Sequence, residues 1–240
     1  TCSVAENISA ASVLIAEAAA KGASFVATPE MTSLLVTKTA DLFDKVREEK
    51  DDEALPAFRS LAAEKNIWLL IGSLPIRLSD EKVANRAFLI SPEGDVAARY
   101  DKIHMFDVDV DGRAYRESAV TAAGAETVAA DVLGRRVGMS ICYDLRFPEL
   151  YRRLASAGAQ VLVVPAAFTD VTGRAHWETL LRARAIENQV VWVSSNLTGR
   201  RGSLRFPGRA KVIGPDGRVR ATTRGRPGVA LGRVDLAEVV

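Results

Sequence analysis

Apolar residues recur along this chain with two different spacings. Between Val4 and Ala18 they return every three or four positions, which predicts an amphipathic helix. Ser3 and Glu6 have the spacing of a capping box at its start, and Gly22 is a suitable stop at its end. The same reasoning predicts further helices at about 53–65, 148–157 and 176–188.

Short apolar runs bounded by turn residues predict strands between these helices. We expect the strands at 24–28, 67–73, 127–132, 160–164, 189–195 and 229–234, with one more that ends at Cys142. Three hairpins are predicted, turning at 78–81, 92–95 and 214–217. The polar stretch 37–52 is predicted as a surface loop or loose helix, and 103–126 as a long functional loop.

Strand–helix units mixed with hairpins are typical of a layered α/β fold with mixed sheets. The chain has 240 residues and shows no linker, low-complexity tract or internal repeat. We therefore expect one domain over residues 1–240.

Composition excludes several classes of function. The 32 basic and 30 acidic residues give a net charge of +2, too little to favour nucleic-acid binding. Aromatic residues make up 6% of the chain, which also argues against a base-stacking surface. No apolar run approaches the roughly 20 residues that span a bilayer, so we expect no membrane contact.

The cysteine and histidine content points to a reducing compartment and away from a metal centre. Two cysteines cannot form a disulfide framework for a chain of this length, and no basic-then-apolar leader is present, so we expect a cytoplasmic protein. With two histidines and no cluster of ligands, a zinc site is not expected.

Cys142 is the first candidate for chemistry. It follows an apolar run and precedes a predicted helix, a position where an α/β enzyme places a nucleophile at the rim of a sheet. The N–H of Tyr143 could then help to hold an oxyanion. The ordinary alternative is a small buried residue, which most free cysteines are.

A cysteine nucleophile needs a base, and the sequence offers two kinds. His104 or His176 could form a Cys-His pair. Glu30 follows a predicted strand and Pro29, so it should lie at a sheet edge, where partial desolvation would suit it to accept a thiol proton. Lys102 follows another strand and could stabilise an oxyanion, although lysines and glutamates are mostly solvated surface groups.

Together these residues and their neighbours resemble the nitrilase, or carbon–nitrogen hydrolase, superfamily. The similarity extends over nearly the whole chain, and is closest to the branch of Nit-type ω-amidases and deaminated glutathione amidases. The segments that carry it are Thr28–Met31, Tyr100–Asp109, Cys142–Leu150 and Ala166–Asn188.

The resemblance implies a four-layer α-β-β-α sandwich with two mixed sheets, and a homodimer or higher homo-oligomer. It implies a catalytic triad of Glu30, Lys102 and Cys142, with Glu117 as a second glutamate near the triad. The Tyr143 N–H would serve the oxyanion.

By the same similarity Arg146, Phe168 and Thr169 are assigned to substrate binding, and a guanidinium suits a substrate carboxylate through its bidentate fork. The expected reaction is hydrolysis of a small linear, carboxylate-bearing amide through a cysteine thioester. Ammonia is released and no cofactor is required.

Two departures from the family pattern accompany this resemblance. Relatives begin with a core strand ahead of the first helix, whereas this chain starts at the helix cap, so we expect that strand to be absent and a sheet edge exposed. The run 203–209 differs from the Tyr-Gly-His-Ser-like run of close relatives, and we expect it to alter which amide is accepted. A non-catalytic binding protein with this fold and a Cys-His hydrolase are the alternative functions.

Overall fold

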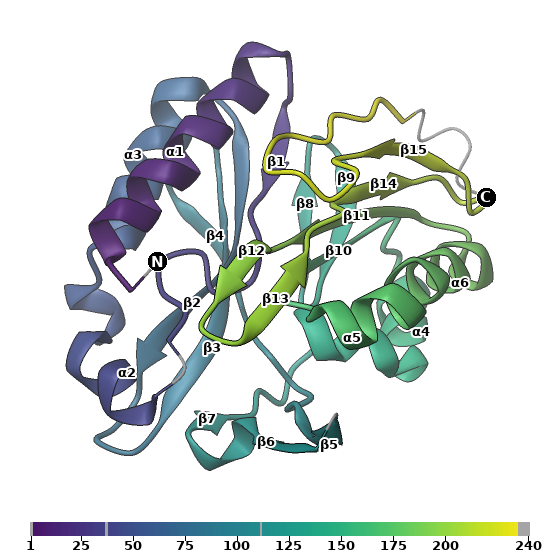
Figure 1. Ribbon diagram of the computed structural model, residues 1–240. Helices are drawn as coiled ribbons and strands as arrows, with labels where there is room; N and C mark the ends of the chain where they lie inside the picture. Colours follow the sequence, from purple (N-terminus) through teal and green to yellow (C-terminus); the bar gives the residue numbers. More distant parts are fainter. Residues whose placement is uncertain (1, 37, 111, 235–240) are drawn as a thin grey trace.

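Two mixed β-sheets pack face to face in the computed structural model, which describes residues 2–36, 38–110 and 112–234 (Figure 1). The first sheet has the order β1-β2-β3-β4, with β7 beside β3. Its strands are β1 (Phe25–Ala27), β2 (Trp68–Arg77), β3 (Val83–Ile90), β4 (Val96–Asp101) and β7 (Thr121–Ala122). β1 pairs parallel to β2, and β3 pairs antiparallel to both β2 and β4, so β1, β2 and β4 run in one direction.

The second sheet has the order β15-β14-β11-β10-β9-β8. Its strands are β8 (Ala129–Val132), β9 (Arg135–Met139), β10 (Val161–Ala166), β11 (Val191–Asn196), β14 (Lys211–Ile213) and β15 (Val219–Thr222). The central strands β9, β10 and β11 are parallel, while β8, β14 and β15 join as antiparallel edges. The three predicted hairpin turns therefore lie where the sequence placed them.

Side-chain alternation along the strands builds two apolar layers on the first sheet. Leu69 and Ile71 of β2 pack with Phe58 of α3 and Ile15 of α1, on the outer face. Leu70, between them, packs on the inner face with residues of the second sheet. A period of two in a strand buried on both faces produces this division, because successive side chains point to opposite sides.

Helices cover the outer face of each sheet and complete the four layers. α1 (Val4–Ala20) and α3 (Ala54–Lys65) lie on the first sheet, and α4 (Pro148–Ser156) and α6 (Glu178–Asn188) on the second (Figure 1). The predicted α-β-β-α sandwich is thus confirmed. Within the described part of the chain, no helix combines the length and apolar character that a bilayer crossing requires.

Caps and stops account for the helix ends. The Ser3 hydroxyl accepts a hydrogen bond from the Glu6 N–H at the start of α1, and Asp52 accepts from Ala54 and Leu55 at the start of α3. Asn66 takes the left-handed conformation, with φ of 50°, after α3. The polar stretch before α3 contains the short helix α2 (Thr39–Lys45) and the 3₁₀ turn η1 (Glu49–Asp51).

Two predicted segments differ from the structure. The segment 103–126 is not a loop throughout: β5 (Asp107–Val110) and β6 (Arg113–Arg116) form a hairpin, followed by the 3₁₀ turn η2 (Glu117–Ala119) and β7. The expected strand at 229–234 is absent: this segment pairs with no strand among the described residues, and Gly232 lies close against Val212 of β14. The apolar residues of 229–234 therefore pack against the second sheet and do not form a strand of that sheet.

The run 203–209 lies in a two-stranded hairpin of β12 (Thr198–Arg201) and β13 (Leu204–Pro207). It follows β11 and projects from the sheets near their centre (Figure 1). Pro207 contacts Gly173, which begins the π-helical turn η4 (Gly173–Trp177) after the three-residue α5 (Asp170–Thr172). Its effect on substrate choice remains a prediction.

Candidate active site

Strand ends from both sheets meet at one place. Glu30 follows β1 and Lys102 follows β4, two strands that run in the same direction within the first sheet. Cys142 comes three residues after β9 of the second sheet, and Ala167 follows the parallel neighbour β10. Carboxyl ends of parallel strands collect at one sheet edge, where α/β proteins place their sites.

Glu30 is buried, with 4% of its surface exposed, and both carboxylate oxygens are held. Oε1 accepts hydrogen bonds from Lys102 Nζ at 3.0 Å and from Asn85 Nδ2 at 2.9 Å. Oε2 accepts from the Ala167 N–H at 2.8 Å, which ties the first sheet to the second. A buried carboxylate requires such donors to offset its desolvation.

Lys102 lies between two carboxylates. Its ammonium is 2% exposed and donates to Glu30 and to both oxygens of Glu117, at 3.0 and 2.8 Å. Burial opposes the positive charge, but the charges of Glu30 and Glu117 outweigh it and hold the pKa of Lys102 well above its usual range. Lys102 is therefore a fixed cation at neutral pH.

Glu117 reaches Lys102 from the loop region rather than from a sheet. It begins η2, and its Oε2 also accepts the Phe106 N–H at 2.7 Å. Asn85 Nδ2 contacts Glu117 Oε1 at 3.3 Å as well as Glu30, so one amide links the two carboxylates. Glu117, which the resemblance placed near the triad, therefore lies in one cluster with Glu30, Lys102 and Asn85.

Cys142 stands on a strained turn instead of at the end of its strand. β9 ends at Met139, and Cys142 opens the 3₁₀ helix η3 (Cys142–Arg146) with φ of 48°. The strand stops because the Asp144 carboxylate accepts the Ile141 N–H at 2.8 Å, while Asp144 N–H donates to the Ile141 carbonyl at 3.0 Å. A left-handed conformation is costly for a residue with a Cβ and is concentrated at functional sites.

The Cys142 thiol lies near the Glu30 carboxylate and the Ala167 N–H, both of which influence its pKa. Burial and the negative charge of Glu30 raise its pKa well above the usual range, and the Lys102 cation only partly opposes them. The thiol is therefore protonated at neutral pH, next to a carboxylate that can accept its proton. The Tyr143 N–H belongs to the first turn of η3, where amides lack a partner within the helix.

Of the three residues assigned to substrate binding, Arg146 ends η3, Phe168 contacts the Arg146 guanidinium, and Thr169 is the next residue in the chain. The Arg146 guanidinium carbon lies 5.5 Å from the centre of the Tyr143 ring and 5.4 Å from that of Phe168, and Nη1 donates to His176 Nδ1 at 3.2 Å. Phe168 is buried and its N–H donates to Asn196 Oδ1 at 3.0 Å. Thr169 is the N-cap residue of α5, with no side-chain capping bond.

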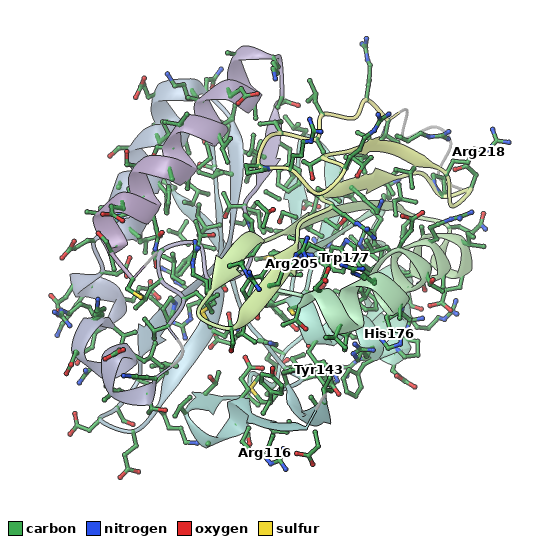
Figure 2. All side chains as sticks on the ribbon, in the orientation of Figure 1. Arg116, Tyr143, His176, Trp177, Arg205 and Arg218 are labelled. Carbon is green, nitrogen blue, oxygen red and sulfur yellow. The ribbon has the colours of Figure 1, made fainter. Side chains whose placement is uncertain are left out.

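Figure 2 shows how the surroundings of η3 are arranged. Tyr143 lies between the β5–β6 hairpin, which carries Arg116, and the helical segment with His176. The Phe106 and Tyr143 rings meet edge to face, with centres 5.1 Å apart. Aromatic side chains and one arginine thus pack together next to the turn that begins at Cys142.

Neither histidine is oriented by a contact with Cys142. His104 Nδ1 lies 2.7 Å from Asp144 Oδ1, and its ring stacks on Phe147 at 3.7 Å. His176 accepts the hydrogen bond from Arg146 described above. The carboxylate base is therefore better supported than the Cys-His alternative.

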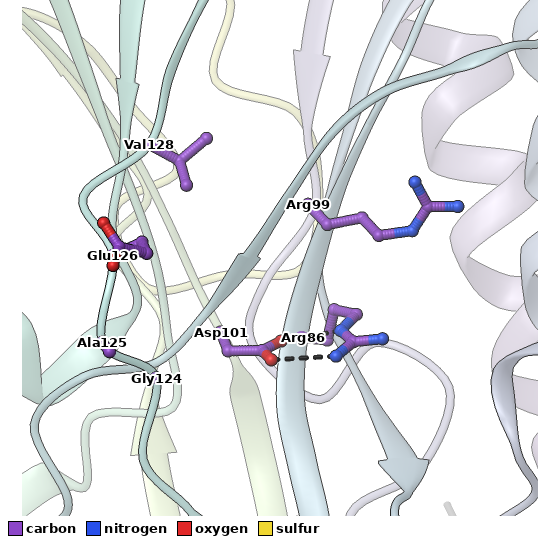
Figure 3. A pocket seen from close by; sticks show the side chains of 7 residues that line it. All are labelled: Arg86, Arg99, Asp101, Gly124, Ala125, Glu126 and Val128. Carbon is purple, nitrogen blue, oxygen red and sulfur yellow. Dashed lines mark hydrogen bonds and ion pairs between the residues drawn. The ribbon is translucent and has the colours of Figure 1, made fainter.

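A separate hollow is lined by residues of β3, of β4 and of the segment 124–128 (Figure 3). Three of its charged groups are paired: Arg86 donates to both oxygens of Asp101 at 2.7 and 2.9 Å, and Arg99 forms an ion pair with Glu49. The lining residues are Arg86, Arg99, Asp101, Gly124, Ala125, Glu126 and Val128. Among the described residues, no group of three or more His, Cys, Asp or Glu side chains is arranged to hold a metal ion.

Sequence reasoning missed three groups in this cluster. Asn85 is fully buried in β3, and a lone amide in a largely apolar strand is the signal that could have shown it. Asp144 lies two residues after Cys142, within the run that carried the resemblance. The Ala167 N–H left no signal, because any residue supplies a backbone amide.

The sequence profile of the carbon–nitrogen hydrolase family matches residues 1–240, so the chain belongs to that family. A Yersinia enterocolitica protein named deaminated glutathione amidase is 43% identical over 189 residues, 77% of this chain and 65% of that protein. The C. elegans NitFhit structure superposes with a TM-score of 0.92 at 35% identity, covering 100% of this chain and 59% of that one. The chain therefore spans less than two thirds of the length of both proteins.

A mutant of the amidase from Nesterenkonia sp. AN1 gives a TM-score of 0.87 at 28% identity, covering 98% of this chain and 89% of that one. That structure shows the product of Michael addition of acrylamide at the active site cysteine of the amidase.

Proposed function

We propose that this protein is an amidase that hydrolyses the C–N bond of a small linear amide through a cysteine thioester and releases ammonia. The observation that carries the proposal is the contact between three buried groups. The Cys142 thiol lies next to the Glu30 carboxylate, which accepts a hydrogen bond from the Lys102 ammonium at 3.0 Å. A nucleophile, a base and a cation thus occupy one desolvated site, where electrostatic stabilisation is strong.

In the proposed mechanism Glu30 removes the thiol proton as Cys142 attacks the amide carbonyl. Lys102 and the Tyr143 N–H stabilise the oxyanion of the tetrahedral intermediate. Glu30 passes the proton to the amide nitrogen, the C–N bond breaks, and ammonia leaves a thioester on Cys142. Glu30 then accepts a proton from the water that attacks the thioester. The C–S bond breaks, Glu30 returns the proton to the Cys142 sulfur, and the carboxylic acid product leaves.

Glu117 takes a positioning role in this scheme. It binds Lys102 through both oxygens and is itself held by the Phe106 N–H. A flexible lysine side chain bound between two fixed carboxylates has little freedom to leave the reaction centre. Orientation of this kind lowers the entropy cost of reaching the transition state.

Arg146 supports a substrate with a carboxylate. Its guanidinium is partly exposed, lies over two aromatic rings, and has a histidine nitrogen rather than a carboxylate as its hydrogen-bond partner. Planar guanidinium groups bind carboxylates through two parallel hydrogen bonds. Together with the amidase names of the relatives, this favours deaminated glutathione or a dicarboxylate monoamide as the substrate.

We also propose that residues 1–240 act as one hydrolase domain and assemble as a homodimer in the cytoplasm. The family match over the full length supports the first point. The two cysteines are free thiols, which suits a reducing compartment. Size measurement in solution, by light scattering, tests the assembly.

Ammonia release tests the proposed activity. We expect the protein to hydrolyse deaminated glutathione or α-ketoglutaramate, and Cys142→Ala to lower kcat/KM by more than about a thousandfold. Arg146→Leu should raise KM for these substrates without a similar effect on a neutral aliphatic amide. Arg218→Ala, on an exposed turn, is the matched control (Figure 2). Substantial ammonia release by Cys142→Ala would contradict the mechanism.

A further inference from the structure

The Asp144 carboxylate is fully buried and is surrounded by hydrogen-bond donors. Oδ1 accepts the His104 N–H at 3.0 Å and lies 2.7 Å from His104 Nδ1. Oδ2 accepts from the Tyr100 hydroxyl at 2.7 Å and from the Ile141 N–H at 2.8 Å. A carboxylate only accepts, so the proton of the His104 ring lies on Nδ1.

These donors come from two segments that are far apart in the sequence. Tyr100 and His104 lie two residues before and two residues after Lys102. Ile141 directly precedes Cys142, and Asp144 itself lies in the same turn, η3. One carboxylate therefore connects the backbone on both sides of the lysine to the backbone on both sides of the cysteine.

Two further observations indicate that this connection is rigid. The His104 ring stacks on Phe147 with an interplanar angle of 8°, and the Phe147 N–H donates to the Asp144 carbonyl at 2.9 Å. Burial and the charge of Asp144 raise the pKa of Tyr100, so its hydroxyl keeps the proton that it donates. A strained residue such as Cys142 persists only where surrounding contacts over-determine its conformation.

We propose that Asp144 is a positioning residue that sets the separation of Cys142 and Lys102 by clamping η3 to the segment 100–104. This inference rests on the proposed roles of Cys142 as nucleophile and Lys102 as the oxyanion cation. Asp144 takes no part in the chemistry itself, because its oxygens are occupied by Tyr100, His104 and Ile141.

The test is Asp144→Asn, which keeps the shape of the side chain but replaces one accepting oxygen with a donor. We expect kcat to fall about 10- to 100-fold, because misplacement of reacting groups by about 1 Å has an effect of this size. KM should change far less, because the substrate contacts at Arg146 and Phe168 remain. The double variant Asp144→Asn/Tyr100→Phe should be no slower than Asp144→Asn alone, because both act on one network.

Asp52→Asn is the matched control. Asp52 also accepts two backbone N–H groups, those of Ala54 and Leu55 at 2.9 and 2.8 Å, but it caps α3 on the outside of the first sheet. A purely structural role of Asp144 would make both variants alike, with altered melting temperatures and unchanged kcat for the folded protein. That result would overturn the inference.

Alkylation of Cys142 by iodoacetamide gives a readout that does not depend on turnover. We expect the midpoint of its pH dependence to shift in Asp144→Asn and to stay at the wild-type value in Asp52→Asn. If the wild type releases no ammonia from any amide, the proposed function fails, and this shift still decides the inference. If Asp144→Asn does not fold, Tyr100→Phe decides it: a wild-type kcat and labelling profile would then overturn the clamp.

Discussion

At the residue scale, the site depends on how each charged group is held. The Glu30 carboxylate has three hydrogen-bond donors, namely Lys102, Asn85 and the Ala167 N–H, and it lies next to the Cys142 thiol. Because these donors come from three different strands or strand ends, the carboxylate has one orientation. In the proposed mechanism, Glu30 as the base therefore faces Cys142 as the nucleophile before a substrate arrives, and no rearrangement is needed at the moment of attack.

Asn85 gives the prediction at this scale. Its Nδ2 contacts both Glu30 and Glu117, and its Oδ1 is buried with no hydrogen-bond partner among the described residues. We expect Asn85→Ala to lower kcat/KM about 10- to 100-fold, because the two carboxylates lose the donor between them. Steady-state kinetics of ammonia release measures this effect.

Asn188→Ala is the matched control for Asn85. Asn188 ends α6, also has a buried Oδ1 without a partner in the described structure, and donates only to the Arg184 carbonyl within its own helix. Its variant should keep wild-type kinetics. Activity within about twofold of wild type in Asn85→Ala would contradict the positioning of Glu30 by this amide.

At the element scale, β2 supports the segment that carries Glu30. Gly72 N–H donates to the Thr28 hydroxyl at 2.9 Å, and Ser73 Oγ accepts the Met31 N–H at 2.9 Å. β2 also shifts register against β3 between Ile71 and Leu74. This irregularity includes Gly72 and Ser73, the residues of β2 that contact Thr28 and Met31 on either side of Glu30.

Gly72→Ala tests that support. A Cβ on Gly72 would lie 2.1 Å from the Thr28 carbonyl oxygen and 2.3 Å from that of Pro29, which are backbone atoms that cannot turn aside. We expect a stability loss of at least about 1–3 kcal/mol, as for overpacked cores, and loss of ammonia release as Glu30 is displaced. Chemical denaturation and kinetics on the folded fraction measure both.

Gly22→Ala is the control that distinguishes a steric clash of the new Cβ from the backbone strain of replacing a glycine with positive φ. Gly22 follows α1 with φ of 89°, and the space that a Cβ would occupy there is open. Its variant should lose roughly 1–2 kcal/mol through backbone strain alone and keep its kcat. Equal kinetics for Gly72→Ala and wild type would show that β2 does not position Glu30.

At the scale of the whole molecule, the site is a junction between the two sheets. Glu30 of the first sheet accepts the Ala167 N–H of the second, and Ser195 Oγ of β11 donates to the Thr28 carbonyl at 2.6 Å. Stability of the sandwich and the protonation of the buried site are therefore linked.

The sign of this linkage follows from the pKa directions. Cys142 and Lys102 both have pKa values raised above their ordinary values near 9.0 and 10.5, so folding favours their protonated forms. Their contribution to stability is complete below about pH 9 and is lost as pH rises above that value. The raised pKa values of Tyr100 and Tyr151 add to the loss above about pH 10.

We therefore expect the melting temperature of the wild type to fall between pH 9 and pH 10, and Cys142→Ala to flatten this part of the curve. Cys2→Ala is the control, because Cys2 is an exposed free thiol. Parallel curves for the wild type and Cys142→Ala from pH 8 to pH 10 would contradict the contribution of the buried thiol.

Local patterns determined most of the elements of this protein. Spacing of apolar residues, caps and turn residues identified α1, α3, α4 and α6 and every strand of the two sheets except β7, because these signals act within a few residues. Positions after predicted strands made Glu30, Lys102 and Cys142 candidates, and the resemblance of short motifs joined them into one triad. The β5–β6 hairpin and the irregular end at 229–234 escaped, since pairing depends on a partner strand.

Only the tertiary structure decided how these residues meet. The sequence placed a thiol at the end of a strand, but the buried Asp144 carboxylate turns the chain at Ile141 and gives Cys142 its left-handed conformation. The contacts of Asn85 and the Ala167 N–H with Glu30 join residues 55 and 137 positions apart. Hydrogen bonds over such separations arise from sheet packing, which no local pattern encodes.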